Sequence, residues 1–203
     1  MVKPAPLGIL ALQGDFAEHL QVLKLAQIPS ILVRKDQDLN AISGLIIPGG
    51  ESTTLRHLMK STGIWHSLLE KKNISFPIFG TCAGIILLAE KILPSANEEG
   101  LGYLPITVMR NAYGRQKDSF IHKIRLKVIE EQEMEGVFIR APIVQLLSPE
   151  VQVLAECEGR PVLIQYSNAL GATFHPELSR KPSIHQYFWE LAQKWWKEHI
   201  RGS

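Results

Sequence analysis

Short apolar runs alternate with stretches of helical hydrophobic spacing in the first half of the chain. The runs cover residues 7–12, 31–33, 45–47 and 76–79. A run without polar alternation is typical of a strand that is buried on both faces. Strands that alternate with helices form a parallel sheet whose two faces are covered by the helices. The sequence therefore predicts an α/β fold.

Several helices are expected around these strands. The first follows Asp15, whose side chain is a candidate N-terminal cap. The second covers residues 54–70 and is interrupted near Gly63, and the third covers residues 83–93. A last helix begins at Ser183, because apolar side chains recur along one stripe from there.

The second half of the chain has a different pattern. Apolar residues stand at or near alternating positions in residues 121–128 and 151–157, which is typical of strands with one exposed face. Residues 162–166 and 171–174 are expected to form further strands. We therefore expect antiparallel strands to be added to a mostly parallel sheet.

Length and composition narrow the class of protein. With 203 residues the chain has room for a single domain, placed at residues 1–200, and residues 201–203 are interpreted as a cloning remnant. Basic residues number 22 and acidic residues 20, and they are spread along the chain, so no nucleic-acid partner is expected. No apolar run is long enough for a membrane span or a signal peptide, so we expect no membrane partner. The two cysteines are expected to be reduced thiols of a cytoplasmic protein, and we expect no metal or cofactor.

Cys82 lies in the sequence FGTCAG, between an expected strand and an expected helix. Gly80 and Gly84 stand two residues before and after it, which matches the spacing of a nucleophile elbow. A thiol at the start of a helix also meets the positive end of the helix dipole, which favours thiolate. A buried structural cysteine is the alternative, since free cysteines are among the most buried residues. The glycine spacing favours the nucleophile.

His175 and Glu177 lie in the sequence FHPEL and are the candidate partners of this thiol. A cysteine nucleophile needs a base, and the base needs an orienting group. If the chain is extended here, as Pro176 favours for the residue before it, the two side chains point the same way. The alternative is a surface loop with a solvated histidine and glutamate. The other histidines are interpreted as surface or core-edge residues: His19, His57, His66, His122, His185 and His199.

Residues 48–54, PGGESTT, follow an expected strand and precede an expected helix. Such a turn leaves backbone N–H groups free to meet an anion or an oxyanion. The sequence lacks the G-x-x-x-x-G-K-[ST] pattern of the P-loop, with which nucleotide hydrolases bind phosphate. A plain turn with a serine or threonine cap is the alternative.

Together these motifs resemble those of the triad class of glutamine amidotransferases, whose glutaminase domain is a flavodoxin-like, three-layer α/β/α sandwich with a Cys-His-Glu triad. More narrowly, the chain is similar to the glutaminase subunits of pyridoxal 5'-phosphate synthase. The similarity covers nearly the whole chain. It is carried by LQGDFAEH (12–19), PGGESTT (48–54), GTCAG (80–84), RNAYGRQKDSF (110–120), GVFIRAP (136–142) and FHPEL (174–178).

The resemblance implies a role for each matching residue. Cys82 would attack the side-chain carboxamide of L-glutamine, His175 would transfer protons, and Glu177 would orient His175. The backbone N–H groups of Gly50 and Ala83 would form the oxyanion hole. The implied glutamine-binding positions are Gly50, Glu51, Ser52, Arg110, Ile139 and Arg140.

The resemblance also implies a partner. Ammonia would pass to the synthase subunit, which is a (β/α)8 barrel, in an assembly of twelve synthase subunits and up to twelve glutaminases. Gln13 matches a position linked to ordering of the oxyanion hole in that complex. The isolated chain is therefore expected to be only weakly active.

Two alternatives stay open at this point. One is a glutaminase that feeds a different synthase, such as imidazole glycerol phosphate synthase, or a γ-glutamyl hydrolase. The other is a binding or redox-sensing module with a reactive Cys82 but no turnover. The runs RNAYGRQ and FIRAP argue against the first, and the presence of His175 and Glu177 argues against the second.

Overall fold

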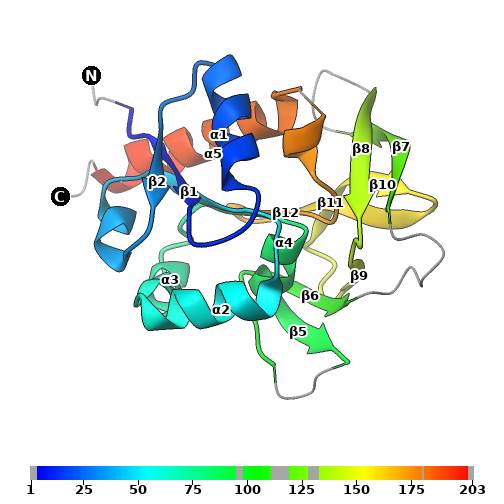
Figure 1. Ribbon diagram of the computed structural model, residues 1–203, viewed down its shortest axis with the longest axis horizontal. Helices are drawn as coiled ribbons and strands as arrows, with labels where there is room; N and C mark the ends of the chain where they lie inside the picture. The colour runs from blue at the N-terminus through cyan, green and yellow to red at the C-terminus, as the bar shows by residue number, and fades with distance from the viewer. Residues whose placement is uncertain (1–3, 95–97, 111–118, 128–132, 180, 201–203) are drawn as a thin grey trace.

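The computed structural model describes residues 4–94, 98–110, 119–127, 133–179 and 181–200. In this part of the chain a nine-stranded sheet runs through the molecule (Figure 1). Its strands, in spatial order, are β2 (Ser30–Val33), β1 (Leu7–Leu10), β3 (Gly44–Ile47), β4 (Ile78–Thr81), β12 (Ala169–Ala172), β11 (Arg160–Tyr166), β10 (Gln152–Cys157), β7 (Ser119–Leu126) and β8 (Glu133–Ile139).

The sheet is parallel at one end and antiparallel at the other. Neighbours from β2 to β12 pair in parallel, and neighbours from β12 to β8 pair in antiparallel fashion. The expected parallel sheet with added antiparallel strands is confirmed. Because β1, β3, β4 and β12 lie side by side, their carboxyl ends meet at one edge, where open α/β sheets bind ligands.

Helices cover both faces of the parallel part and complete the expected three-layer sandwich (Figure 1). On one face lie α1 (Phe16–Leu25) and α5 (Ser183–Ile200), and on the other lie α2 (Ser52–Ser61), α3 (Ile64–Lys72) and α4 (Ala83–Leu88). Two short 3-10 helices are η1 (Asp36–Asn40) and η2 (Pro176–Leu178). The predicted interruption near Gly63 is confirmed, because this residue has a left-handed φ of 77° between α2 and α3.

Alternate side chains of the parallel strands enter two different hydrophobic clusters. In β3, Leu45 and Ile47 pack with α2, α3 and α4, whereas Ile46 packs with α1 and α5. In β4, Ile78 and Phe79 divide in the same way. Successive side chains of a strand point to opposite faces, so both faces of these strands are buried. This explains why the runs contain no polar residues.

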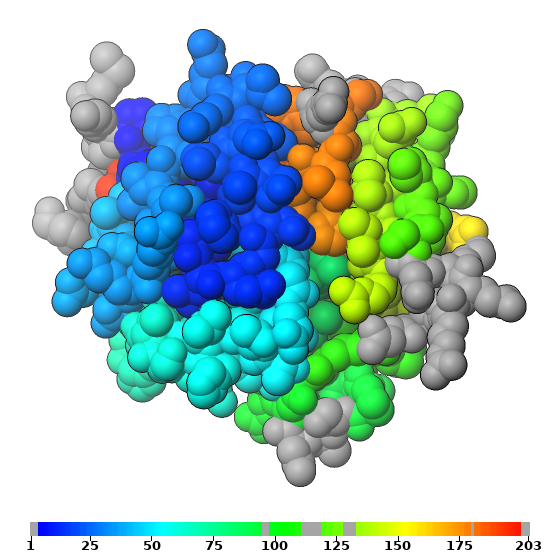
Figure 2. All heavy atoms as spheres, viewed as in Figure 1, coloured from blue at the N-terminus to red at the C-terminus, as the bar shows by residue number. Residues whose placement is uncertain are grey.

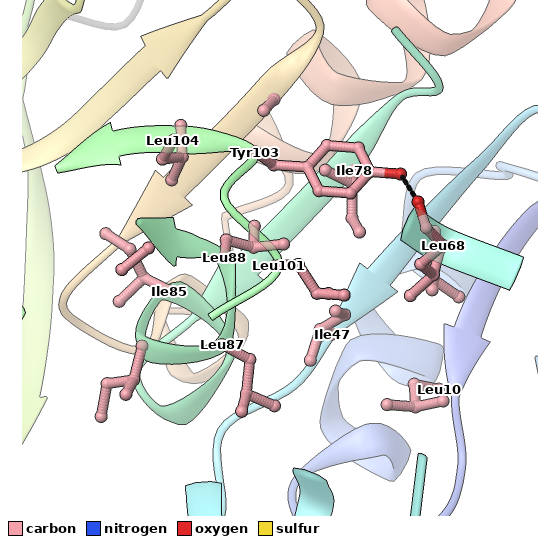
Figure 3. Close-up of a cluster of buried hydrophobic side chains, with 14 of the residues drawn as sticks. Leu10, Ile47, Leu68, Ile78, Ile85, Leu87, Leu88, Leu101, Tyr103 and Leu104 are labelled. Carbon is pink, nitrogen blue, oxygen red and sulfur yellow. Dashed lines mark hydrogen bonds between the residues drawn. The ribbon is translucent and has the colours of Figure 1, made fainter. Parts of the chain in front are cut away.

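The helix α4 is buried along its whole length behind the carboxyl end of β4. Figure 3 shows its residues Ile85, Leu87 and Leu88 within one cluster of buried side chains. In the same cluster the Tyr103 hydroxyl donates a hydrogen bond to the Leu68 carbonyl oxygen at 2.6 Å. Full burial of one leucine-sized side chain contributes roughly 1.5–3 kcal/mol. The cluster therefore fixes α4, and with it the residue just before the helix.

The predicted helix over 83–93 is wrong in its second half, because the α-helix ends after six residues and a strand follows. Leu101 N–H donates to the Leu87 carbonyl, and Gly102 N–H donates to the Ala89 carbonyl. These are carbonyl groups that a longer helix would bond internally. Here these carbonyl groups accept hydrogen bonds from residues 101 and 102 instead, so pairing with a later part of the chain overrides the local helical pattern.

A second, three-stranded sheet lies outside the expected pattern, as does β8. The sheet has the order β5 (Ala89–Leu93), β6 (Leu104–Met109) and β9 (Ile143–Leu146). In β6, Leu104, Ile106 and Val108 are buried at alternating positions. A period-two signal for this strand is therefore present in the sequence.

Three predicted strands are shifted along the chain, and one of them is β7, which covers Ser119–Leu126 in place of the expected 121–128. The strand expected over 76–79 is β4, which begins at Ile78, and the one expected over 171–174 is β12, which begins at Ala169. Ile78 and Ala169 lie opposite each other in the sheet, so the register of this pair sets both boundaries. None of the described helices has the length and apolar character needed to cross a membrane.

Candidate active site

A cavity of about 580 Å3 opens at the edge where the parallel strands end. On the face shown in Figure 2, the N-terminal segment, the start of α2, the end of β8 and the region of η2 come together around this place. The cavity is lined by Gln13, Asp15, Gly50, Glu51, Ser52, Thr53, Cys82, Ala83, Ile86, Arg110, Ile139, Arg140 and His175. Apart from Glu177, every site residue predicted from the sequence contributes to this lining.

A larger hollow of about 740 Å3 lies along α5. It is lined by residues of that helix between Trp189 and Glu198, and neither a thiol nor an imidazole is among them. The smaller cavity contains both groups. Chemistry rather than size therefore identifies the candidate site.

Cys82 is the single residue between β4 and α4, and its backbone is in a sparsely populated conformation. Its φ is 48° and its ψ is −101°. A non-glycine residue in such a region costs about 1–3 kcal/mol and persists only where its surroundings hold it. Here Cys82 N–H donates to the Ala172 carbonyl at 2.9 Å, and the buried α4 follows. The thiol is 3.7 Å from the Ile139 carbonyl oxygen at the cavity wall.

The two glycines around Cys82 are required by close backbone contacts. A Cβ added to Gly84 would lie 2.1 Å from the Ile47 carbonyl oxygen. A Cβ added to Gly80 would lie 2.5 Å from the carbonyl carbon of Gly84. Real Cβ atoms do not approach backbone atoms so closely. The elbow predicted from the glycine spacing is therefore present, for a reason that the structure makes explicit.

His175 joins the thiol to a buried carboxylate. Its Nδ1 lies 2.7 Å from Glu177 Oε1, and its ring lines the same cavity as the Cys82 thiol, which acts to raise the pKa of His175. Both His175 and Glu177 are only 4% exposed. Nδ1 is thus committed to Glu177, while the ring lines the cavity that holds the thiol, which suits a cysteine nucleophile and its base.

Burial and hydrogen bonding act in opposite directions on this pair. Burial lowers the pKa of His175, but hydrogen bonds and charge from Cys82 and Glu177 outweigh it and raise the pKa to about 10. Burial raises the pKa of Glu177, and the hydrogen bond and charge of His175 oppose that rise. Since two groups favour the charged form of His175, we assign the shared proton to the imidazole and the negative charge to Glu177.

The expectation of an extended chain at this motif is wrong. His175 has φ of −104° and ψ of 85°, and this ψ is below the range of about 120–160° that a following proline favours. Glu177 lies in the 3-10 helix η2. The carboxylate therefore reaches Nδ1 by a turn of the chain and not along a strand.

The predicted cap at Asp15 is wrong, although α1 begins at the next residue. The side chain makes no capping hydrogen bond. Its Oδ2 lies instead 3.5 Å from His175 Nδ1, so it adds a second carboxylate beside the imidazole. Asp15, His175 and Glu177 offer ligand atoms within 4.8 Å of one another, but the proton on Nδ1 competes with any cation for that place.

Gln13 ties the loop after β1 to the PGGESTT turn. Its side-chain Oε1 accepts a hydrogen bond from Glu51 N–H at 3.0 Å. Gly50, the residue before Glu51, has a φ of 149°, a conformation that favours glycine. Ala83, the other residue predicted for the oxyanion hole, is the first residue of α4 and lines the same cavity. The orientation of the Gly50 peptide is thus coupled to Gln13.

Two guanidinium groups reach the cavity from different elements. Arg110 follows β6 and pairs with Glu98, which also accepts a hydrogen bond from Arg56 at 2.8 Å. Burial, and then the positive charge of Arg56, lowers the pKa of Arg110. Arg140 follows β8 with a positive φ of 43° and is exposed. The rest of the RNAYGRQKDSF motif, residues 111–118, lies outside the described residues.

His19 and His185 are not the surface or core-edge residues that the sequence suggests. Both are fully buried, and His19 Nε2 lies 3.4 Å from Glu177 Oε2, on the side away from His175. The available signal is their spacing, since His19 falls four residues before the buried Leu23 and His185 three residues before the buried Phe188. A histidine on the apolar stripe of a helix must find a polar partner in the core.

A family model described as "SNO glutamine amidotransferase family" matches residues 9–194. A protein from Dictyoglomus turgidum named "Pyridoxal 5'-phosphate synthase subunit PdxT" is 44% identical over 182 residues, which are 90% of this chain and 96% of that protein. A protein of the same name from Streptomyces coelicolor is 41% identical, covering 92% of this chain and 93% of that protein.

Solved structures give the same picture. A crystal structure of a glutamine amidotransferase has a TM-score of 0.87 and 42% sequence identity, and covers 92% of this chain and 98% of that one. The crystal structure of a glutamine amidotransferase from Thermotoga maritima has a TM-score of 0.60 at 15% identity, and covers 96% of this chain and 86% of that one. The second likeness concerns the fold alone.

Proposed function

The chain belongs to the SNO glutamine amidotransferase family, and we propose that it is the glutaminase subunit of a pyridoxal 5'-phosphate synthase. The reaction is hydrolysis of L-glutamine to L-glutamate and ammonia. The single observation that carries this proposal is that Cys82 and His175 line one cavity while the buried Glu177 holds His175 Nδ1 at 2.7 Å. The cavity volume of about 580 Å3 lies within the range of small-molecule sites, about 300–1,000 Å3.

The chemistry proceeds in two halves. In the first, Cys82 Sγ forms a bond to the carboxamide carbon of glutamine, His175 gives its proton to the departing nitrogen, and the C–N bond breaks to release ammonia. In the second, a water molecule gives a proton to His175 and attacks the thioester carbon. The C–S bond then breaks, glutamate leaves, and the thiolate is restored. Glu177 keeps the imidazole aimed and stabilises its charged form.

The negative oxygen formed in each half needs hydrogen-bond donors. We assign this role to the backbone N–H groups of Gly50 and Ala83, which belong to two different strand-to-helix turns at the cavity. One such donor commonly contributes about 3 kcal/mol to stabilisation of the transition state. Gln13 accepts a hydrogen bond from Glu51 N–H and so controls the orientation of the turn that contains Gly50.

The amino-acid end of glutamine carries an α-carboxylate and an α-ammonium group. Arg110 and Arg140 supply guanidinium partners for the carboxylate, and Glu51 supplies a carboxylate for the ammonium. Ser52 and Ile139 complete the predicted binding surface, since both line the cavity beside the thiol. The substrate is therefore held between the two turns, with its carboxamide at Cys82.

Ammonia that escapes into water is protonated and lost as a nucleophile, so a glutaminase of this kind works next to its consumer. We assign the consumer to the synthase subunit, which is a (β/α)8 barrel that forms a cytoplasmic assembly of twelve synthase subunits with up to twelve glutaminases. Docking activates the glutaminase, and the isolated chain turns over slowly. The names of the relatives favour this acceptor over a different synthase.

The test is release of ammonia and glutamate from L-glutamine, measured with and without the synthase subunit. We expect strong activation by that subunit, loss of activity in Cys82→Ala, and retained activity in the matched control Cys157→Ala. Activity that survives in Cys82→Ala would remove the proposed nucleophile. Equal turnover with and without the synthase would remove the proposed coupling, and absence of turnover in both conditions would favour a binding module.

A further inference from the structure

The Glu177 carboxylate has one oxygen without an ordinary partner. Oε1 accepts from His175, but Oε2 is fully buried and makes no hydrogen bond of ordinary geometry with any described residue. The Nε2 atom of His19 lies 3.4 Å from it. A buried polar atom that is left unpaired costs about 1–3 kcal/mol, and more when it is charged. His19 is placed to supply the missing donor.

The fully buried His19 side chain lies close to three polar groups: the His185 ring, the Thr81 hydroxyl and the Glu177 carboxylate. Its Nδ1 is 2.9 Å from Nε2 of His185, and its Nε2 is 3.2 Å from Thr81 Oγ1. Thr81 is the last residue of β4 and directly precedes Cys82. His185 is also fully buried, and its Nδ1 has no hydrogen-bond partner in the described part of the chain.

Both of these histidines are neutral in the folded protein. Burial lowers the pKa of His19 well below its ordinary value, and the electrostatic influence of His185 and of His175 lowers it further. Burial lowers the pKa of His185 to about 3. A neutral imidazole has one N–H and one lone pair, so only one of the two facing nitrogens can donate.

The unpartnered nitrogen of His185 decides the direction of this bond. If His19 donated from Nδ1 to His185 Nε2, the proton of His185 would be on its Nδ1, as a buried N–H without an acceptor. His19 Nε2 would then turn a lone pair toward the Glu177 carboxylate. In the reverse arrangement, His185 Nε2–H donates to His19 Nδ1. The proton of His19 is then on Nε2, where it faces both Glu177 Oε2 and Thr81 Oγ1. Only this arrangement leaves no buried N–H of the two histidines unpaired.

We propose that His19 is a positioning residue of the glutaminase, which donates its Nε2–H to Glu177 Oε2 and so keeps this buried carboxylate ionised and its Oε1 aimed at His175. His185 fixes the required tautomer of His19 from the other side. The proposal rests on the proposed function for its role in turnover, but the state of the triad that it describes exists without substrate.

The proposal has a definite consequence for pH dependence. In the described part of the chain, Glu177 is faced by His175 from its own turn, by His19 from α1 and by Asp15 from the residue before α1, with His185 of α5 behind His19. Loss of the His19 donor disfavours the ionised carboxyl group and raises its pKa. The imidazolium then loses its counter-ion at a higher pH. Below that pH the imidazolium charge acts on the thiol without opposition from the carboxylate, which favours the thiolate, so the acid limb of Cys82 reactivity moves to lower pH.

The test is the pH dependence of Cys82 alkylation by iodoacetamide, read by mass spectrometry of the Cys82 peptide. In His19→Leu we expect the acid limb to move down, by up to about one pH unit, since a hydrogen bond to a charged group is worth at least that much in the pKa of Glu177. His19→Asn, whose amide does not extend to the Nε2 position, serves as a second loss variant. His19→Gln places an N–H near the position of Nε2 and should restore most of the wild-type profile.

His66→Asn is the matched control, because the His66 side chain is 81% exposed on α3, and its profile should equal that of the wild type. An acid limb that stays in place in folded His19→Leu and His19→Asn, checked by circular dichroism, would overturn the proposal. So would a His19→Gln profile no better than that of His19→Leu. Ammonia release by the complex with the synthase subunit is measured in parallel. If the wild type releases none, the proposed function fails, while the alkylation profiles still decide the role of His19.

Discussion

Glu177 Oε1 lies 2.7 Å from His175 Nδ1, in a buried pair that reaches the cavity only through the imidazole. This geometry lets the carboxylate act on the thiol without touching the substrate. Glu177→Gln keeps the shape but removes the negative charge, and it also allows the imidazole to take the wrong tautomer. We expect kcat to fall by about 100-fold or more, with KM little changed. Steady-state glutaminase kinetics of the complex with the synthase subunit provide the measurement.

The control for that variant is Glu70→Gln, because the Glu70 side chain is 70% exposed and pairs only with the exposed His66 in the described part of the chain. Its kinetics should match the wild type. A Glu177→Gln enzyme with wild-type kcat would show that the carboxylate is merely structural.

The contact of Gly84 with the Ile47 carbonyl oxygen predicts a sensitive position in the elbow. In Gly84→Ala the new Cβ must displace the backbone of β3 or of α4, since the unrelaxed distance is 2.1 Å. We expect a loss of about 1–3 kcal/mol in the free energy of unfolding, as for other overpacked core sites, together with a large loss of activity. Urea unfolding and glutaminase assays check both.

Gly159→Ala is the comparison for this variant, because it has a left-handed φ of 73° but nothing within 4 Å of an added Cβ. It should lose about 1–2 kcal/mol from backbone strain and retain full activity. If Gly84→Ala behaved like Gly159→Ala, the close approach would not be what shapes the elbow.

The raised pKa of His175 predicts how stability depends on pH. The folded value of about 10 is above the ordinary value of 6.5, so the contribution to stability is complete below pH 6.5 and is lost as pH rises toward 10. The stability advantage of the wild type over His175→Gln should therefore shrink across this window. Urea unfolding at pH 6, 8 and 10 measures it. An advantage that is constant or that grows with pH contradicts the assignment of the proton to His175.

The sequence predicts the parallel core and most of the site because local patterns carry both. Apolar runs predict the buried strands, and the glycine spacing around Cys82 identifies the elbow. The chain after Leu88 could not be predicted in this way, since its strand depends on hydrogen bonds with residues 101 and 102. His19 shows the same limit, because its partner Glu177 is distant in sequence and no local pattern joins them.

The hydrogen bond from Glu51 N–H to Gln13 predicts a separable role in catalysis. Gln13→Ala removes the acceptor at the edge of the cavity, where water can replace it, so the free energy of unfolding should change by about 1 kcal/mol or less. We expect activity in the complex with the synthase subunit to fall much more, because the Gly50 turn loses its tether. Gln37→Ala, at an exposed position of η1, is the control and should leave both quantities unchanged. Full activation of Gln13→Ala by the synthase subunit would show that Gln13 does not control the oxyanion hole.

The proposed mechanism requires Cys82 to form a thioester with the glutamyl group of glutamine. Acid quenching of the complex with the synthase subunit during turnover, followed by peptide mass spectrometry, tests it most directly. We expect a glutamyl adduct on the Cys82 peptide that depends on glutamine, decays when glutamine is exhausted and is absent from Cys82→Ala. Ammonia release without any adduct at Cys82, or with an adduct at Cys157 instead, would contradict it.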